Sequence, residues 1–89
     1  MLTRNLPIQM LVCCDTDGRM QPLRFRFEDA EHRLHTAQIR EILDSHKSEY
    51  VGIEAFFFVC CAEVEGLKKL YELKYTIHTH KWVLFRELY

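Results

Sequence analysis

Two histidines, His78 and His80, have the spacing in this sequence that comes nearest to a chemical site. On a strand they would project on the same side, as metal ligands on a β-hairpin do. Zinc needs three or four ligands, however, and no carboxylate or cysteine lies at a matching spacing. Because both histidines fall in a predicted loop, we interpret them as solvated side chains and keep a metal site at His78 and His80 as the weaker alternative.

The four cysteines form two adjacent pairs, Cys13-Cys14 and Cys60-Cys61. Neighbouring residues on a strand point to opposite faces, so neither pair resembles a disulfide framework or a CxxC redox motif. A nucleophilic thiolate would need a nearby base or a helix N-terminus, and the sequence indicates neither. We therefore predict free, buried thiols.

The glycines are isolated and form no phosphate-binding loop, so we expect no catalytic residue, no cofactor and no enzymatic activity.

A polar surface is the best candidate for binding. It would form if the predicted second, third and fifth strands share one side of a sheet, bringing together Arg24, Arg26, Gln38, Arg40 and Lys74. Trp82 could add the aromatic stacking that is typical of sites for single-stranded nucleic acid. Acidic residues on the same strands, Glu28, Glu54 and Glu72, would cancel much of the positive charge. A solvated face of mixed charge is therefore favoured over a nucleic-acid site.

The composition is that of one small folded domain covering residues 1–89. Hydrophobic residues make up 48% and charged residues 28%, with a formal net charge of -1, so no long-range positive field attracts nucleic acid. The longest apolar run, Ala55 to Ala62, is far shorter than the roughly 20 residues of a membrane helix. The first residues lack the apolar core of a secretory signal. We expect a cytoplasmic protein without a membrane partner.

Alternation of apolar and polar residues predicts an all-β fold. It is clearest in Leu70 to Ile77 and Lys81 to Phe85, which are predicted to form a hairpin with one solvent-exposed face. Further strands are predicted at Ile8–Cys14, Arg19–Glu28, Leu34–Leu43 and Val51–Val64, with turns at Asp15–Gly18, Asp29–His32 and Glu65-Gly66. About six antiparallel strands thus form a meander, and the doubly apolar fourth strand requires the sheet to curl into a small barrel or roll.

Two features of the middle of the chain leave alternatives open. The polar stretch Asp44 to Glu49 reads as a connection between strands. Ile42 and Leu43 break the alternation before it, which indicates a bulge or a helical turn near Glu41. The segment Glu31 to Leu43 also fits one face of a helix, although the strand interpretation is favoured.

The phrases Pro22 to Asp29 (PLRFRFED), Leu70 to Tyr75 (LYELKY) and His80 to Phe85 (HKWVLF) resemble those of a group of short, uncharacterised bacterial proteins from Firmicutes. The resemblance covers about two thirds of the chain and implies an all-β fold without an assigned activity. Members of that group encoded near Y-family DNA polymerases imply an accessory role in DNA repair. The chain departs from the group's pattern at its N-terminal residues and at residues 44–53.

These patterns predict a binding or adaptor module that acts through protein contacts. The partner is either another protein or a second copy, pairing with an exposed strand edge near Pro22 or with the aromatic C-terminal strand. The alternative function is weak nucleic-acid binding through Arg24, Arg26, Arg40 and Lys74, with a steep dependence on salt.

Overall fold

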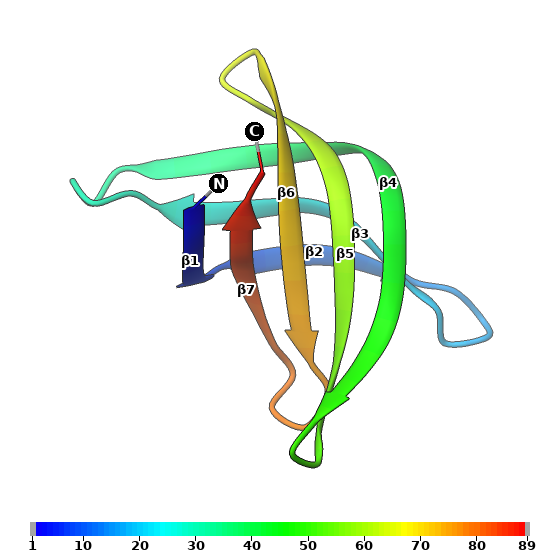
Figure 1. Ribbon diagram of the computed structural model, residues 1–89. Helices are drawn as coiled ribbons and strands as arrows, with labels where there is room; N and C mark the ends of the chain where they lie inside the picture. The colour runs from blue at the N-terminus through cyan, green and yellow to red at the C-terminus, as the bar shows by residue number, and fades with distance from the viewer. Residues whose placement is uncertain (1, 89) are drawn as a thin grey trace.

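The computed structural model describes residues 2–88, with side chains from Asn5 onward. It confirms an all-β antiparallel architecture, and the described residues contain no helix that could span a membrane. The strands are β1 (Leu2–Pro7), β2 (Gln9–Cys14), β3 (Met20–Glu28), β4 (Leu34–Tyr50), β5 (Ile53–Val64), β6 (Leu67–Thr76) and β7 (Lys81–Glu87), drawn in Figure 1.

All seven strands belong to one sheet in the order β1-β7-β6-β5-β4-β3-β2. The predicted meander accounts for β2 to β7, and β1, which the sequence patterns did not indicate, pairs with β7. β1 and β2 lie at opposite edges of the sheet, yet only Ile8 separates them along the chain. The sheet must therefore curl until its edges meet at Ile8, and Figure 1 shows the hairpin β2–β3 crossing behind β5 to β7.

The predicted turns are present and have local causes. The Asp15 carboxylate accepts hydrogen bonds from the backbone N–H groups of Asp17 and Arg19, each at 2.9 Å. Gly18 follows with a φ of 84°, a conformation that glycine adopts without steric cost. Glu65 and Gly66 both have positive φ and form the two-residue turn between β5 and β6.

The prediction for Asp44 to Glu49 was wrong, and so was the helical alternative for Glu31 to Leu43. β4 continues as one strand through both segments to Tyr50. Two register shifts, at Ile39/Glu41 and at Ile42/Asp44, bend β4, which confirms the bulge predicted near Glu41. Its polar second half remains a strand because it pairs along its length with β5, whose aromatic residues supply the apolar surface.

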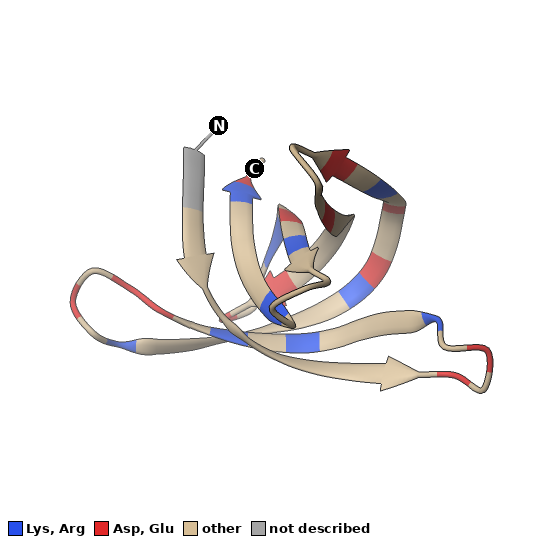
Figure 2. Ribbon diagram, turned by 90° about the horizontal axis from the view of Figure 1, so that it is seen from below, with Lys and Arg blue, Asp and Glu red and all other residues tan. Residues whose placement is uncertain are grey.

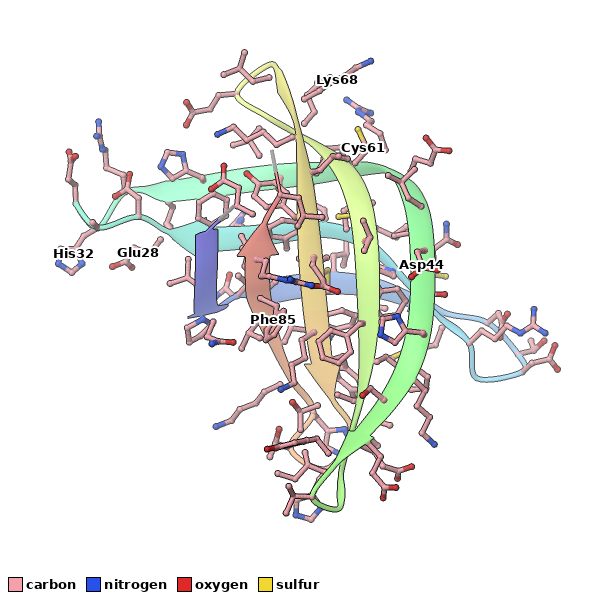
Figure 3. All side chains as sticks on the ribbon, viewed as in Figure 1. Glu28, His32, Asp44, Cys61, Lys68 and Phe85 are labelled. Atoms are coloured by element: carbon pink, nitrogen blue, oxygen red, sulfur yellow. The ribbon has the colours of Figure 1, made fainter. Side chains whose placement is uncertain are left out.

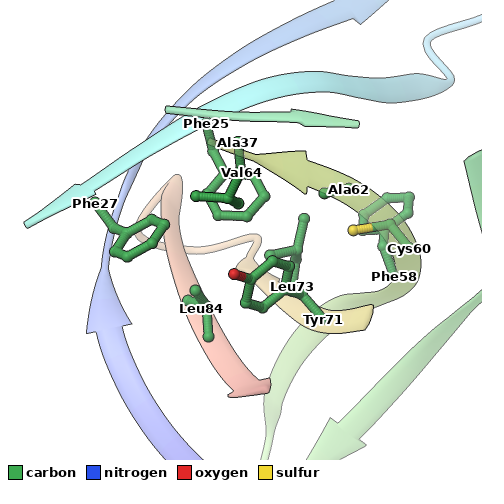
Figure 4. Packing of buried hydrophobic residues seen from close by; sticks show 10 residues of the cluster. All are labelled: Phe25, Phe27, Ala37, Phe58, Cys60, Ala62, Val64, Tyr71, Leu73 and Leu84. Carbon is green, nitrogen blue, oxygen red and sulfur yellow. The ribbon is translucent and has the colours of Figure 1, made fainter. Parts of the chain in front are cut away.

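The core lies between the hairpin β2–β3 and the inner face of β5 to β7. Figure 4 shows ten of its buried residues: Phe25, Phe27, Ala37, Phe58, Cys60, Ala62, Val64, Tyr71, Leu73 and Leu84. Tyr71 meets Phe25 edge to face, with ring centroids 5.6 Å apart. The alternation of β3 and β5 puts these residues on one side of the sheet, so the residues between them occupy the outer face.

Candidate functional site

β2 forms one edge of the sheet. It pairs with β3 on one side, and no other strand of the described residues pairs with it. Ile8, just before β2, still donates to the carbonyl of Trp82 at 3.2 Å, and from there the free edge of β2 diverges from β7. The edge from Met10 to Cys14 can therefore accept another strand.

Alternation of hydrogen bonds determines which residues of β2 face that edge. Asp15 donates its N–H to the carbonyl of Arg19 at 3.0 Å, so this pair is hydrogen-bonded, and Cys14 opposite Met20 is not. The ladder has a register shift between Leu11 and Val12, where Leu23 of β3 is the extra residue, so β2 itself stays regular. The alternation then assigns residues 13, 11 and 9 to β3 and directs the N–H and C=O groups of Met10, Val12 and Cys14 outward, as Ile8 does toward Trp82. Pro22, which lacks an N–H, lies opposite Val12, where β3 donates no bond to β2.

The free edge of β2 carries no charge. Its sequence is Gln-Met-Leu-Val-Cys-Cys, and Figure 2 shows the strand without a basic or acidic position. Leu11, on the outer face, is 52% exposed. Proteins usually protect an edge strand with lysine, proline or a bulge. At the other edge, β1 has such protection, because Asn5 lies in a register shift with a φ of 45° and the strand ends at Pro7.

Trp82 lies on the inner face of the curled sheet and not on the outer face with the basic residues. Its ring packs on Tyr75 at 4.9 Å and on Phe58 at 5.6 Å between centroids. Trp82 and Phe56 are only partly buried at the border of the core. They form an apolar inner wall at the end of the sheet that the hairpin β2–β3 leaves incompletely covered.

The structure brings only part of the predicted basic surface together. Arg24 lies opposite Gln38, which in turn lies opposite Glu63 and then Lys68, in one row across β3 to β6. Lys74 is six residues further along β6 than Lys68, about 20 Å away at the rise of a strand. Figure 3 shows Lys68 beside the β5–β6 turn. Counting the register back from that turn would have identified Lys68 as the lysine of this row.

Lys74 belongs instead to an aromatic cluster on the outer face. Its Nζ lies 5.8 Å from the ring centroid of Phe57 and 5.7 Å from that of Phe85. His46 stacks on Phe57 with centroids 5.3 Å apart. The register shift in β6–β7 turns both Phe85 and Arg86 to this face, where Arg86 pairs with Glu72.

The acidic residues that were expected to neutralise the basic surface have other partners. Glu54 pairs with Lys47 at 2.8 Å, and Glu63 pairs with Arg40 at 3.1 Å. Glu28 contacts His32 at 2.6 Å in the β3–β4 region labelled in Figure 3. Arg24 and Arg26 remain exposed on β3, and neither forms an ion pair with any residue the structure describes.

His78 and His80 lie in the turn between β6 and β7, both exposed. His80 has a φ of 60°, so the two side chains do not share the side of a strand as the metal hypothesis requires. Its Nδ1 hydrogen-bonds the hydroxyl of Tyr75 at 2.9 Å. Among residues 2–88, no group of three or more histidine, cysteine or acidic side chains is arranged to hold a metal ion.

The four cysteines differ in burial, and Cys61 is partly buried. Cys60 is buried in the core, where desolvation raises the pKa of its thiol to about 12 and keeps it protonated. Cys13 and Cys14 are exposed at the end of β2, so the prediction that they are buried was wrong. The expectation failed because the end of the hairpin β2–β3 extends beyond the core.

A charged cluster that the sequence did not indicate joins two turns. His35 donates from Nε2 to Asp29 at 2.7 Å and from Nδ1 to Glu65 at 2.5 Å, while its ring stacks on Phe27. The hydrogen bond to Asp29, followed by that to Glu65, raises the pKa of His35. The hydrogen bond from His35 is also the main reason that the pKa of Asp29 falls to about 2. Through these two hydrogen bonds, His35 connects the β3–β4 turn to the β5–β6 turn.

A pocket of about 460 Å³ opens where β3 and β4 separate. The ladder between them ends at Arg24 opposite Gln38, after which β4 follows β5 alone. The pocket is lined by Asp17, Gly18, Arg19, Met20, Ser45, His46, Lys47, Phe56 and Phe58. Its apolar floor is thus continuous with the inner wall near Trp82.

Comparisons of the chain with protein-family models, with curated proteins and with solved structures find no match.

Proposed function

We propose that this protein is a cytoplasmic protein-binding module that accepts an extended segment of a partner protein as an added strand along β2. The free, uncharged edge from Met10 to Cys14 is the observation that carries the proposal. Strand addition obtains its affinity from main-chain hydrogen bonds, which Met10, Val12 and Cys14 can provide, and its specificity from alternate side chains.

The edge differs from the two that the sequence indicated. β7, the aromatic C-terminal strand, has neighbours on both sides, β6 and β1. Pro22 directs no N–H toward the gap between β3 and β4, so it cannot donate to an added strand there. β2 combines free donors, free acceptors and a partly exposed apolar neighbourhood, and this supports it as the docking edge.

The resemblance to proteins encoded beside Y-family DNA polymerases makes a DNA-repair protein the first partner to test. Tagged wild-type protein, Val12→Pro and Val12→Thr would be expressed in a Firmicutes host and purified at moderate salt, with quantitative mass spectrometry of the eluates. Val12→Pro removes an outward N–H without removing a bond to β3, whereas Val12→Thr retains the backbone donor.

We expect wild-type protein and Val12→Thr to retain the same partner, and Val12→Pro to lose at least about nine tenths of it, since several adjacent hydrogen bonds are disrupted together. Circular dichroism would verify that all three proteins are folded. Equal recovery of the partner by folded Val12→Pro would contradict binding along β2.

A further inference from the structure

We infer that the segment bound along β2 alternates apolar and acidic side chains, the apolar ones facing the inner wall and the acidic ones facing Arg24 and Arg26. This inference rests on the proposed strand addition and specifies the chemistry of its partner.

The inner side of the added strand would face apolar groups. Side chains of a strand alternate between its two faces, so every second partner residue would lie beside Met10 and Val12. Met10, Phe56 and Trp82 all pack at the border of the same core, so the inner side of an added strand would face this apolar wall at about the 10 Å that separates packed layers. A polar side chain here would lose its hydration without gaining a partner. Apolar residues are therefore expected at these positions.

The outer side of the added strand would meet positive charge. Arg26 lies opposite Gln9, and Arg24 lies opposite Leu11. A strand added to β2 is two strand spacings, about 10 Å, from β3. An arginine can span that distance by laying its aliphatic stem over Gln9 or Leu11 and extending its guanidinium to the next strand.

Charge complementarity selects acidic residues for the outer positions. Arg24 and Arg26 have no ion-pair partner among the described residues, and β2 contributes no charge of its own. Figure 2 shows basic positions along β3, with acidic positions only toward the ends of the hairpin. A glutamate or aspartate facing the two arginines would be attracted and a lysine repelled, which gives specificity more than affinity.

Three fluorescently labelled short peptides would test the inference, each alternating valine with glutamate, lysine or threonine. Binding to the intact protein would be measured by anisotropy at low salt. We expect the glutamate peptide to bind about tenfold more tightly than the lysine peptide, with threonine between them. The variant Arg24→Glu with Arg26→Glu should reverse this order, while Arg24→Gln with Arg26→Gln should abolish the preference.

Proline variants distinguish failure of this inference from failure of the proposed function. Val12→Pro and, independently, Cys14→Pro at the exposed end of the strand should abolish binding of all three peptides. Unchanged peptide binding by both folded variants would overturn strand addition itself. Loss of binding in these variants together with equal wild-type affinity for the three peptides would overturn only the acidic preference.

Single-stranded nucleic acid is the competing polyanion for the same arginines. Labelled oligothymidylate would serve as the probe under the same conditions. A nucleic-acid surface predicts tight oligothymidylate binding that is lost in Arg24→Glu with Arg26→Glu and unchanged in Val12→Pro. This result, combined with equal affinity for the three peptides, would overturn the inference. Absence of oligothymidylate binding alongside the glutamate preference would support it.

Discussion

The free edge of β2 and the free edge of β4 have the same backbone chemistry and opposite side-chain character. Beyond Gln38, β4 pairs with β5 only, so its other edge is as unpaired as that of β2. β4 is bent by two register shifts and carries several charged residues, whereas β2 is uncharged from Gln9 to Cys14 and the one register shift of its ladder places the extra residue, Leu23, on β3. Bulges and charges prevent chance pairing of edges. The comparison shows that β2 lacks the charged side chains that accompany the free edge of β4, which is the basis for proposing β2 as the docking edge.

The same comparison applies to individual backbone groups. Tyr50 and Ile53 flank a two-residue turn and form a hydrogen-bonded pair, so Ser45, Lys47 and Glu49 direct their N–H and C=O groups to the free edge of β4. Lys47 is engaged in an ion pair with Glu54 at 2.8 Å. In β4, charged side chains therefore accompany the exposed backbone groups, whereas the corresponding side chains in β2 are Met10, Val12 and Cys14.

The largest expected effect separates the two sides of β2. Cys13→Pro removes an N–H that bonds to β3 and leaves the carbonyl of Gln21 without its donor, so we expect it to lower the free energy of unfolding by about 2–4 kcal/mol. Val12→Pro removes an outward N–H and should cost less than about 1 kcal/mol. Urea denaturation of both variants measures the difference. Equal destabilisation would show that the alternation assigned to β2 is wrong.

Removing charge from β4 should make it resemble β2. In the double variant Lys47→Val with Glu49→Val, we expect the free energy of unfolding to change by no more than about 1 kcal/mol. Self-association should increase, because the second edge loses its charged protection. Sedimentation velocity over a range of concentrations would detect this. The matched control is Lys68→Val, on a strand with neighbours on both sides, and an equal increase in that variant would attribute the association to general hydrophobicity.

The smallest expected effect is a pH dependence of stability. It arises in the half of β4 that pairs with β3, where His35 hydrogen-bonds Asp29 and Glu65. The raised pKa of His35 means that the protonated ring stabilises the fold fully below about pH 6.5, and this contribution disappears as pH rises through the raised value. The Asp29 carboxylate, with its pKa near 2, contributes above about pH 3.8 and ceases to do so as pH falls through about 2.

Thermal melts across this pH range would measure the effect of the cluster. The melting temperature of the wild-type protein should fall at pH values above the raised pKa of His35. At pH 5, His35→Gln should be less stable than the wild-type protein, and its melting temperature should not show this fall at higher pH. An identical alkaline decline in His35→Gln would assign the pH dependence to other groups.

Local patterns predicted most of the fold. Alternation identified β3, β6, β7 and the first half of β4, and the run that is apolar on both faces identified β5. The apolar stretch before Asp15 identified β2, and Asp and Gly located the reversals at Asp15–Gly18 and Glu65-Gly66. β1 escaped prediction because a register shift at Asn5 interrupts its alternation. The second half of β4 was predicted as a connection because its residues are polar and show no apolar alternation. They form a strand because they pair with the aromatic residues of β5, and this pairing exists only in the folded sheet.

The candidate site was less predictable, because it depends on register and curvature. The sequence identified Arg24 and Arg26 as neighbours on one face, and they are. Lys74 was grouped with them although its row across the sheet is different, and Trp82 was placed with them although its face is the inner one. The unpaired state of β2 follows from the strand order, which no local pattern contains.

Residue-resolved amide hydrogen exchange by NMR tests the central claim most directly. If β2 is a free edge with the assigned alternation, the amides of Met10, Val12 and Cys14 exchange rapidly, whereas those of Leu11 and Cys13 are protected by bonds to β3. Uniform protection along β2, or protection of the three outward amides, would contradict an edge open to an added strand.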